Sequence, residues 1–261
     1  MISFIKYHGT GNDFILIDDR KTLLELKSEA IRKMCDRHFG IGADGLIQLR
    51  DKKGYDFEML YFNSDGQTGS MCGNGGRCAT AFAHSLGLIQ NHAKFIAFDG
   101  AHEAKIISQK PYIVNLHMND VMDIEINNEF IYMNTGSPHY VCFIDNVNEA
   151  DVFNEGKKIR YNGRFKKEGV NVNFVMEKDG ALHVRTYERG VEDETLSCGT
   201  GVTASVIASV ISGKNISSGC VIHTPGGELT VYFNQNGKTF SNIWLEGEAE
   251  KVFGGTMSVN E

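Results

Sequence analysis

Two short segments, Met71-Cys72-Gly73-Asn74-Gly75-Gly76 and Ser197-Cys198-Gly199-Thr200-Gly201-Val202, repeat one pattern 126 residues apart. Each segment places a cysteine directly before a Gly-x-Gly turn. A stretch of small and apolar residues follows each cysteine, at 77–86 in the first copy and 203–211 in the second. The repetition predicts that the chain is a duplication, and that a buried helix begins beside each of two matched thiols.

The two stretches after the cysteines lack the charged face of a surface helix. In the second copy, apolar residues between Val202 and Ile211 are separated by alanine and serine, which predicts a helix buried on all sides. Gly87 and Gly213 are expected to end the two helices, because glycine tolerates the left-handed conformation that commonly terminates a helix. Each half is therefore expected to contain one central, buried helix.

The rest of the chain is dominated by strand signals. Residues 55–61 alternate aromatic or apolar with polar side chains, which predicts a half-buried strand. Asp99-Gly100, Asp179-Gly180 and Pro225-Gly226-Gly227 each separate two such runs and predict antiparallel hairpins. An amphipathic surface helix is expected over about 23–37. The predicted fold class is α+β, with a mostly antiparallel sheet or barrel wrapped around the buried helix of each half.

The length of the chain favours two domains over one. Its 261 residues make two halves of ordinary domain size. We expect an N-terminal domain over residues 1–116, completed by a C-terminal strand within 249–261, and a C-terminal domain over 117–248. No Pro- or Ser-rich linker marks the junction, which is expected near 116–120.

Composition excludes several classes of function. The net charge of −7 argues against a nucleic-acid surface, which needs clustered Lys and Arg. The N-terminus lacks the apolar core of a signal peptide, and no stretch approaches the about 20 apolar residues of a membrane span. We therefore expect a cytoplasmic protein with reduced thiols. Its six cysteines and nine histidines show neither Cys-x-x-Cys nor His-Glu-x-x-His spacing, so no metal site is expected.

The matched thiols, Cys72 and Cys198, point to a proton-transfer reaction. The unpaired amides and positive dipole of a helix N-terminus lower the pKa of a neighbouring thiol and bind a substrate carboxylate. Two thiols that face one carbon from opposite sides can remove a proton from one face and return one to the other. This is the chemistry of a racemase or epimerase. Free cysteine is usually a small buried hydrophobe, and that reading applies to Cys35, Cys78, Cys142 and Cys220.

The segments that precede the two cysteines also correspond. Tyr61 and Tyr187 each lie 11 residues before their cysteine, so that Asn63 occupies the place of Arg189. The guanidinium of Arg189 offers a bidentate fork for a carboxylate, and Glu188 is a candidate partner for an ammonium group. A surface ion pair is the alternative for these two charged side chains, and a simple turn is the alternative for Asn63.

Four motifs give the chain a specific resemblance to the diaminopimelate epimerase family. They occur in the family's order, and the similar segments extend from Ile5 to about Glu248. The motifs are His8-Gly9-Thr10-Gly11-Asn12-Asp13-Phe14, Gly40-Ile41-Gly42-Ala43-Asp44-Gly45, Cys72-Gly73-Asn74-Gly75 and Cys198-Gly199-Thr200-Gly201. The resemblance implies two pseudo-symmetric domains with the active site in their cleft. It also implies a cofactor-independent isomerase, which works without pyridoxal phosphate. This isomerase would interconvert L,L- and meso-diaminopimelate in lysine and cell-wall precursor synthesis. The resemblance is also compatible with a homodimer.

The resemblance assigns roles to individual residues. Cys72 and Cys198 would be the catalytic pair. Substrate-binding residues would be Asn12, Asn63, Gly73, Asn74, Asn171, Glu188, Arg189, Gly199 and Thr200, with His139 and Ser137 in support. Taken alone, each asparagine is equally well explained as a turn or cap residue, and His139 as a hydrogen-bonded structural residue.

The chain departs from the family pattern in two places. Many members have Asn where this chain has Ser137, which changes the expected contact to the distal end of the substrate. The spacer 191–197 is one residue longer than the common form, which would move Glu188 and Arg189 relative to Cys198.

Three other interpretations compete with this one, and the presence of both thiols argues against one of them, an inactive or binding-only relative. Proline racemases share the two-cysteine logic, but they usually have His where Asn74 stands. The segment 199–204 also fits the Gly-x-Gly-x-x-Ala dinucleotide fingerprint, although 192–197 is too polar for the buried strand that must precede it. Two activated thiols can also oxidise to a disulfide, which we expect to inactivate the protein.

Overall fold

The computed structural model describes residues 1–69, 71–214 and 216–258. The chain divides into two compact units, which are described separately below. Unit 1 consists of Met1–Leu116 and Gly247–Glu261, and unit 2 consists of His117–Glu246.

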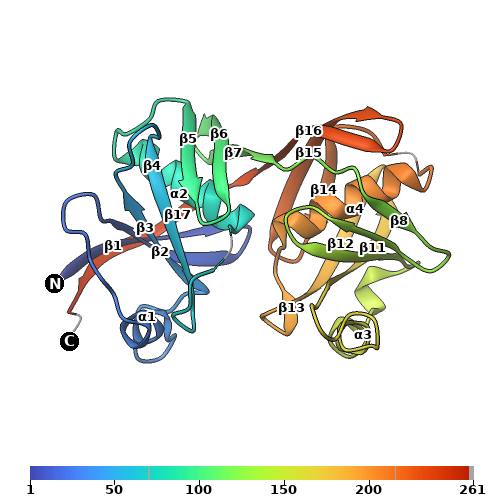
Figure 1. The fold of residues 1–261 in the computed structure, drawn as a ribbon, viewed down its shortest axis with the longest axis horizontal. Coiled ribbons are helices and arrows are strands. Elements are labelled where there is room, and N and C mark those ends of the chain that lie inside the picture. Colours follow the sequence, from blue (N-terminus) through green and yellow to red (C-terminus); the bar gives the residue numbers. More distant parts are fainter. Residues whose placement is uncertain (70, 215, 259–261) are drawn as a thin grey trace. The chain divides into compact units, whose positions relative to one another are not determined.

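Unit 1 is built from strands around one long helix (Figure 1). Its strands are β1 (Ile2–Gly9), β2 (Asn12–Asp18), β3 (Gly45–Arg50), β4 (Phe57–Asn63), β5 (His92–Ala97), β6 (Gly100–Gln109), β17 (Glu250–Met257) and the first part of β7 (Tyr112–Met118). Its helices are α1 (Ser28–Cys35) and α2 (Gly73–Ser85). The C-terminal strand β17 pairs antiparallel with β1, so the two ends of the chain lie side by side.

Unit 2 repeats this plan. Its strands are β8 (Ile124–Ile126), β9 (Ile131–Asn134), β10 (Pro138–Phe143), β11 (Asn171–Lys178), β12 (Ala181–Glu188), β13 (Asp193–Thr195), β14 (Cys220–Thr224), β15 (Gly227–Asn236) and most of β16 (Thr239–Glu248). Its helices are the 3-10 helix η1 (Val147–Glu149), α3 (Val152–Arg160) and α4 (Gly199–Ile211).

The strand pairings confirm a duplicated fold. In unit 1 the pairs β1–β2, β3–β4 and β5–β6 are antiparallel, whereas β2–β3 and β4–β5 are parallel. In unit 2 the same alternation runs from β9 to β15: β9–β10, β11–β12 and β14–β15 are antiparallel, and β10–β11 and β12–β14 are parallel. α2 packs against β1, β2, β3, β4 and β6, and α4 packs against their counterparts β9, β10, β11, β12 and β15. The predicted α+β class with a central helix in each half is confirmed.

Both central helices are buried, and most of their residues are small or apolar. Every residue of α2 from Gly73 to Ala83 is buried, and in α4 nearly every residue from Gly199 to Ser209 is. The helices end where the sequence predicts: Gly87 and Gly213 each have a φ of 72°. The Leu88 amide donates to Ala83 O and the Lys214 amide to Ser209 O, which satisfies carbonyls that a helix end would otherwise leave unpaired.

The hairpins predicted from turn residues are present. Asp179 and Gly180 join β11 to β12 with φ values of 53° and 77°, as a tight two-residue turn requires. The other two predicted turns join β5 to β6 and β14 to β15. In β4, Phe57 and Met59 are buried and Glu58 between them is less so, as the predicted alternation requires.

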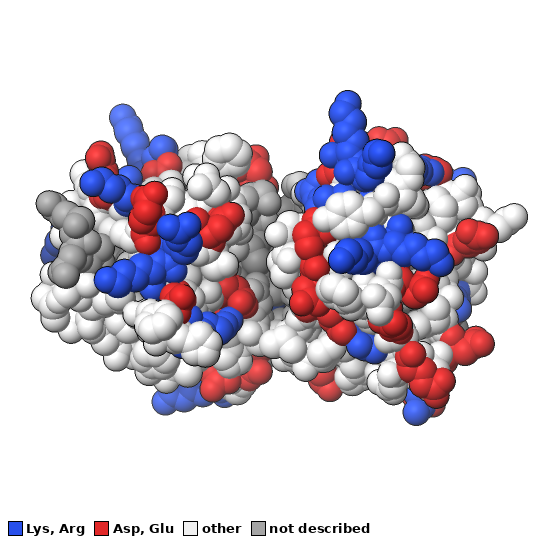
Figure 2. Space-filling view, turned by 90° about the horizontal axis from the view of Figure 1, so that it is seen from below, with Lys and Arg blue, Asp and Glu red and all other residues white. Residues whose placement is uncertain are grey.

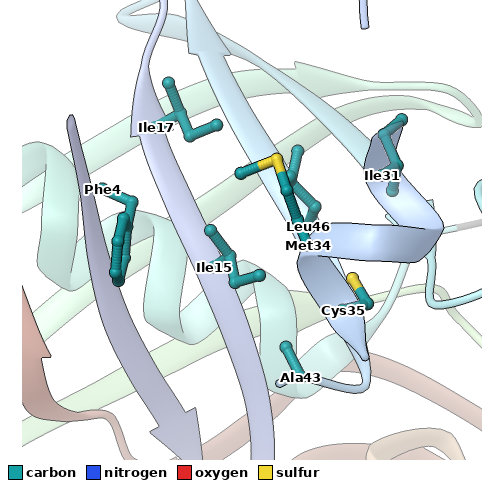
Figure 3. Close-up of a cluster of buried hydrophobic side chains, with 8 residues drawn as sticks. All are labelled: Phe4, Ile15, Ile17, Ile31, Met34, Cys35, Ala43 and Leu46. Atoms are coloured by element: carbon teal, nitrogen blue, oxygen red, sulfur yellow. The ribbon is translucent and has the colours of Figure 1, made fainter. Parts of the chain in front are cut away.

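The surface helix is shorter than the predicted 23–37. α1 begins only at Ser28, because Leu23 has a left-handed φ of 48° and the Leu24 amide donates to the buried Asp19 carboxylate at 2.7 Å. The apolar stripe itself is correct: Ile31, Met34 and Cys35 pack on Phe4, Ile15, Ile17, Ala43 and Leu46 (Figure 3). This cluster holds α1 against strands β1 to β3, next to the loop that carries Asp44.

The visible face of each unit carries mixed charge. Figure 2 shows positive and negative side chains interspersed on both units. Among the described residues, no helix is long and apolar enough to cross a membrane.

Candidate active site

Cys72 lies at the N-terminus of α2. It is the N-cap residue, with φ −104° and ψ 123°, and its carbonyl accepts the first helical hydrogen bond from the Gly76 amide at 2.8 Å. The amides of the first turn, among them those of Gly73 and Asn74, lie at the end of α2 where the helix dipole gives a positive potential. Cys72 is half-buried.

Asn12, at the start of β2, faces Cys72. Its Nδ2 donates to the Asp44 carboxylate at 2.7 Å, which directs its Oδ1 to the other side. That oxygen lies 3.5 Å from Cys72 Sγ and accepts from Asn74 Nδ2 at 3.3 Å. The structure thus brings together the three predicted residues Asn12, Cys72 and Asn74, and Asp44 is the residue that orients them.

Arg77 holds this cluster in place from inside the unit. Its side chain is fully buried and donates to Asn74 Oδ1 at 2.9 Å, to Thr10 Oγ1 at 3.2 Å and to the Glu248 carbonyl at 3.4 Å. Burial lowers the pKa of this guanidinium. We did not predict a role for Arg77 from the sequence, because an arginine in the first turns of a helix gives no sign that it points inward.

A network of charges anchors the β1–β2 turn that carries Asn12. Asp13 accepts two hydrogen bonds of 2.9 Å from Arg37 and one of 2.8 Å from the buried Lys6. Arg37 also reaches Asp44 at 2.7 Å. Burial alone would raise the pKa of Asp13, but the hydrogen bonds from Arg37 and Lys6 outweigh it and lower the pKa to about 2.

This lowered pKa makes the stability of the protein depend on Asp13 at acid pH. The contribution is complete above the unfolded-state pKa of about 4 and is lost as the pH falls from about 4 through 2. We expect the urea midpoint of wild type to exceed that of Asp13→Asn at pH 6 and the difference to shrink over this window. A difference that stays constant between pH 6 and pH 2 would contradict the assignment.

Cys198 occupies the equivalent position in unit 2. It is the N-cap of α4, with φ −122° and ψ 108°, and the Val202 amide donates to its carbonyl at 2.9 Å. It is buried, with 7% of its surface exposed. Gly199 and Thr200 form the first turn of α4, so the amides that the family resemblance assigns to substrate binding lie at the positive end of the helix.

His139 and Thr200 form a hydrogen-bonded group with Cys198. His139 Nε2 lies 2.9 Å from Thr200 Oγ1, which in turn lies 3.5 Å from Cys198 Sγ. Burial, with a smaller effect of the Arg189 charge, lowers the pKa of His139 to about 3, so the imidazole is neutral at physiological pH. His139 is therefore linked to Cys198 through the hydroxyl of Thr200.

Arg189, Asn171 and Ser137 form a second polar group in unit 2. Arg189 Nη2 donates to Ser137 Oγ at 3.2 Å, and Asn171 Nδ2 donates to the same oxygen at 3.0 Å. The Arg189 amide donates to Asn171 Oδ1 at 2.8 Å. Ser137 therefore joins two predicted substrate-binding residues. Glu188, at the end of β12, accepts from Thr195 Oγ1 at 2.9 Å.

Asn63 differs from the other predicted residues. It is exposed at the end of β4, and its backbone closes a turn in which its amide donates to Gln67 O and its carbonyl accepts from the Gly66 amide. Within the described residues its side chain has no hydrogen bond to Asn12, Cys72 or Asn74. The turn alternative accounts for everything the structure shows of Asn63.

One glycine in each unit lies against its cysteine. A Cβ added at Gly75 would come within 3.5 Å of Cys72 Cβ, and one added at Gly201 would come within 3.4 Å of Cys198 Sγ and collide with Asn173 Oδ1. The closest atoms to an added Cβ are Ile47 Cδ1 at 3.2 Å for Gly75 and Asn173 Oδ1 for Gly201. A side chain at Gly201 would therefore displace the buried amide of Asn173, whereas one at Gly75 would press only slightly on its neighbours.

The remaining cysteines have the properties of structural residues. Burial raises the pKa of Cys35 and of Cys142 to about 12 and also raises the pKa of Cys78 and Cys220. All six cysteines are thiols, none of them in a disulfide. Within the described ranges 1–69, 71–214 and 216–258, no group of three or more His, Cys, Asp or Glu is placed to hold a metal ion.

The dinucleotide-binding alternative does not fit the strand before Cys198. β13 has three residues, is largely exposed or half-buried, and pairs antiparallel with β12. A dinucleotide fingerprint requires a buried strand of a parallel sheet at this position. The match of residues 199–204 to that pattern is therefore accidental.

Comparisons with known proteins identify the family. The family model described as diaminopimelate epimerase matches residues 4–119 and 131–252. The chain is 51% identical over 254 residues to a diaminopimelate epimerase of Flavobacterium psychrophilum, covering 97% of this chain and 98% of the relative. It is 43% identical over 260 residues to that of Chlorobaculum tepidum, covering 96% and 99%.

Solved structures show the same fold at much lower identity. A phenazine biosynthesis protein of the PhzF family from Bacillus anthracis superposes with a TM-score of 0.75 at 13% identity, covering 98% of this chain and 99% of that one. A probable proline racemase from Agrobacterium radiobacter gives 0.72 at 14% identity, covering 100% and 94%. The likeness to proline racemase is thus one of fold. Because the family model and the relatives match nearly the whole chain, and each unit has a thiol at a helix N-terminus, the chain belongs to the diaminopimelate epimerase family.

Proposed function

We propose that this protein interconverts L,L-diaminopimelate and meso-diaminopimelate, and that Cys72 and Cys198 move the proton. Family membership supports the substrate. The observation that carries the mechanism is that each unit places one cysteine at the N-terminus of a buried helix. The four other cysteines all have raised pKa values.

The proposed reaction needs no oxidant or group transfer. The thiolate of one cysteine takes the Cα hydrogen as a proton and becomes a thiol, which leaves a carbanion on the substrate. The carbanion takes a proton from the thiol of the other cysteine on the opposite face, and that cysteine becomes the thiolate. The two cysteines exchange roles when the reaction runs backwards.

The helix termini supply the electrostatic stabilisation in this scheme. The Cα hydrogen of an amino acid is a very weak acid, so negative charge that develops on the carboxylate during deprotonation must be stabilised. The first-turn amides of α2 and α4, at Gly73, Asn74, Gly199 and Thr200, are donors with a fixed orientation. Because they are held in place before the substrate arrives, they need no reorganisation during the reaction.

We assign the polar group of Arg189, Asn171 and Ser137 to the recognition of the substrate's amino-acid groups. The guanidinium already donates to Ser137 and to the Glu168 carbonyl, so its orientation is fixed by the protein. Ser137 takes a place that many family members fill with Asn, and its contacts to Arg189 and Asn171 suit it to position these two side chains.

Two further expectations remain predictions. The family resemblance is compatible with a homodimer, which light scattering of the purified protein will test. The expected cytoplasmic location is tested by fractionation of cells that express the protein.

Proton NMR in deuterated water tests the proposed function. Reduced protein is mixed with L,L-diaminopimelate, and loss of the Cα-H signal is followed together with the appearance of the meso isomer. We expect both at once, without added pyridoxal phosphate. Exchange without inversion would contradict the two-thiol mechanism. The absence of any exchange would contradict the assignment of diaminopimelate as the substrate. Proline in place of diaminopimelate is the control.

A further inference from the structure

Asn173, which no sequence motif singled out, has a side chain whose orientation is fixed by its neighbours. It lies in β11 with no exposed surface. Its Nδ2 is 3.1 Å from the carbonyl oxygen of Tyr140, and its Oδ1 accepts from Thr186 Oγ1 at 3.0 Å. A carbonyl oxygen only accepts hydrogen bonds, so the atom that faces it must be the amide nitrogen.

The orientation of Asn173 determines which nitrogen of His139 carries the proton. Nδ2 of Asn173 lies 3.0 Å from His139 Nδ1 and donates to it, so Nδ1 has no proton. The buried imidazole is neutral, because burial lowers its pKa to about 3. A neutral imidazole carries one proton, which must therefore be on Nε2.

The proton on Nε2 in turn orients Thr200. Nε2 lies 2.9 Å from Thr200 Oγ1, so the histidine donates and the hydroxyl accepts. Asn171 Nδ2 is 3.5 Å from the same Nε2, but it has a better acceptor in Ser137 Oγ at 3.0 Å. The hydroxyl proton of Thr200 is left to point away from His139, and Cys198 Sγ lies 3.5 Å from this oxygen.

We propose that Asn173 is a positioning residue that holds His139 in the Nε2-H tautomer, so that the Thr200 hydroxyl donates to Cys198 and stabilises its thiolate. A donor at the sulfur favours the charged form, whereas a hydroxyl turned the other way would favour the thiol. The role of this thiolate as a base rests on the proposed function. The hydrogen-bond polarity itself rests only on the contacts within unit 2.

The other groups near Cys198 keep their charge in the Thr200 variants used below. Arg189 is positively charged and acts on His139, and Glu188 lies at the end of β12 beside Thr195. The amides of Gly199 and Thr200 add the positive end of α4. Removing one neutral hydroxyl from Thr200 changes none of these charges, so a change in the pKa of Cys198 reports on the hydroxyl.

The first test reads the tautomer directly. ¹⁵N NMR of the full-length protein labelled at histidine distinguishes protonated from unprotonated ring nitrogens, and His139 is assigned by comparison with His139→Gln. We expect the Nε2-H tautomer in wild type. In Asn173→Asp a carboxylate faces Nδ1 and can only accept, so we expect the proton to move to Nδ1. An Nδ1-H tautomer in wild type would overturn the proposal.

The second test measures the thiolate of Cys198. Wild type, Thr200→Val and Thr200→Ser are alkylated with iodoacetamide over a range of pH, and the rate at each cysteine is read by peptide mass spectrometry. We expect Thr200→Val to raise the pKa of Cys198 by about one unit, about tenfold less thiolate at neutral pH, since one hydrogen bond to a charged group is lost. Thr200→Ser should have the wild-type pKa of Cys198, and the pKa of Cys72 should be the same in all three proteins.

An unchanged pKa of Cys198 in Thr200→Val would refute the donor role of the hydroxyl. A shift that Thr200→Ser does not reverse would show that shape, not the hydroxyl, is responsible, and would equally refute it. Thermal unfolding of each variant confirms that it is folded. Neither test uses substrate, so a failure of the proposed epimerase activity would leave both results interpretable.

Discussion

Replacing Cys72 or Cys198 by serine is expected to lower the turnover of L,L-diaminopimelate by about 10²- to 10⁴-fold, the usual contribution of a positioned general acid or base. The hydroxyl of serine is a far weaker acid than a thiol, so it neither forms the base at neutral pH nor returns a proton as readily. Both variants should unfold at the same urea concentration as wild type, because serine preserves the size of the side chain. Turnover is measured by the NMR assay described above.

Cys142→Ser is the matched control for this experiment. Its sulfur lies on β10 and donates to the Asn173 carbonyl at 3.5 Å, an interaction that a hydroxyl can also make. Burial raises the pKa of this thiol to about 12, so it supplies no thiolate at neutral pH. We expect wild-type turnover from Cys142→Ser. Near wild-type turnover from either Cys72→Ser or Cys198→Ser would disprove the two-thiol mechanism.

Replacing Arg189 by methionine is expected to lower kcat/KM for diaminopimelate by about 10- to 10²-fold, equivalent to the about 1.5–3 kcal/mol of a hydrogen bond to a charged group. Methionine keeps the apolar part of the side chain beside Gly169 and removes the guanidinium that we assign to a substrate carboxylate. The measurement is steady-state kinetics over a range of substrate concentrations.

Arg164→Met controls for the loss of a positive charge from unit 2. Arg164 is exposed and pairs with Glu125 at the surface, where an ion pair contributes little to stability. Its removal should leave kcat/KM unchanged. If the two variants lose the same activity, the effect of Arg189 is one of overall charge and its assignment to substrate recognition is wrong.

Much of the fold could be predicted because the relevant signals are local. Gly87 and Gly213 end their helices through their own backbone conformation, and Asp179-Gly180 forms a turn with residues adjacent in the chain. The prediction for 23–37 failed at its N-terminal end because a long-range interaction intervened: Asp19 binds the Leu24 amide and is itself bound by Arg50 at 2.7 Å.

The candidate site was predicted in part. The sequence pattern identified Cys72 and Cys198, since each repeats the same glycine-rich setting, and the family resemblance added Asn12, Asn171 and His139. Asp44 lay inside one of the quoted motifs, yet its effect on Asn12 depends on a contact across 32 positions of the chain. Nothing in the sequence indicated that Asn173 and Arg77 belong to the site. Their roles depend on whether the groups that face them in the folded protein donate or accept hydrogen bonds.

By itself, the sequence determined the two thiols at helix N-termini and the ends of the central helices, because each depends on neighbouring residues in the chain. It also revealed the duplication, through one motif that recurs 126 residues later. Only the tertiary structure decided which groups donate and which accept hydrogen bonds around the thiols. Asp44 turns the oxygen of Asn12 toward Cys72. The Tyr140 carbonyl orients Asn173, which acts through His139 to turn the Thr200 hydroxyl toward Cys198. The physical reason is that a side chain able both to donate and to accept takes its direction from partners that can do only one.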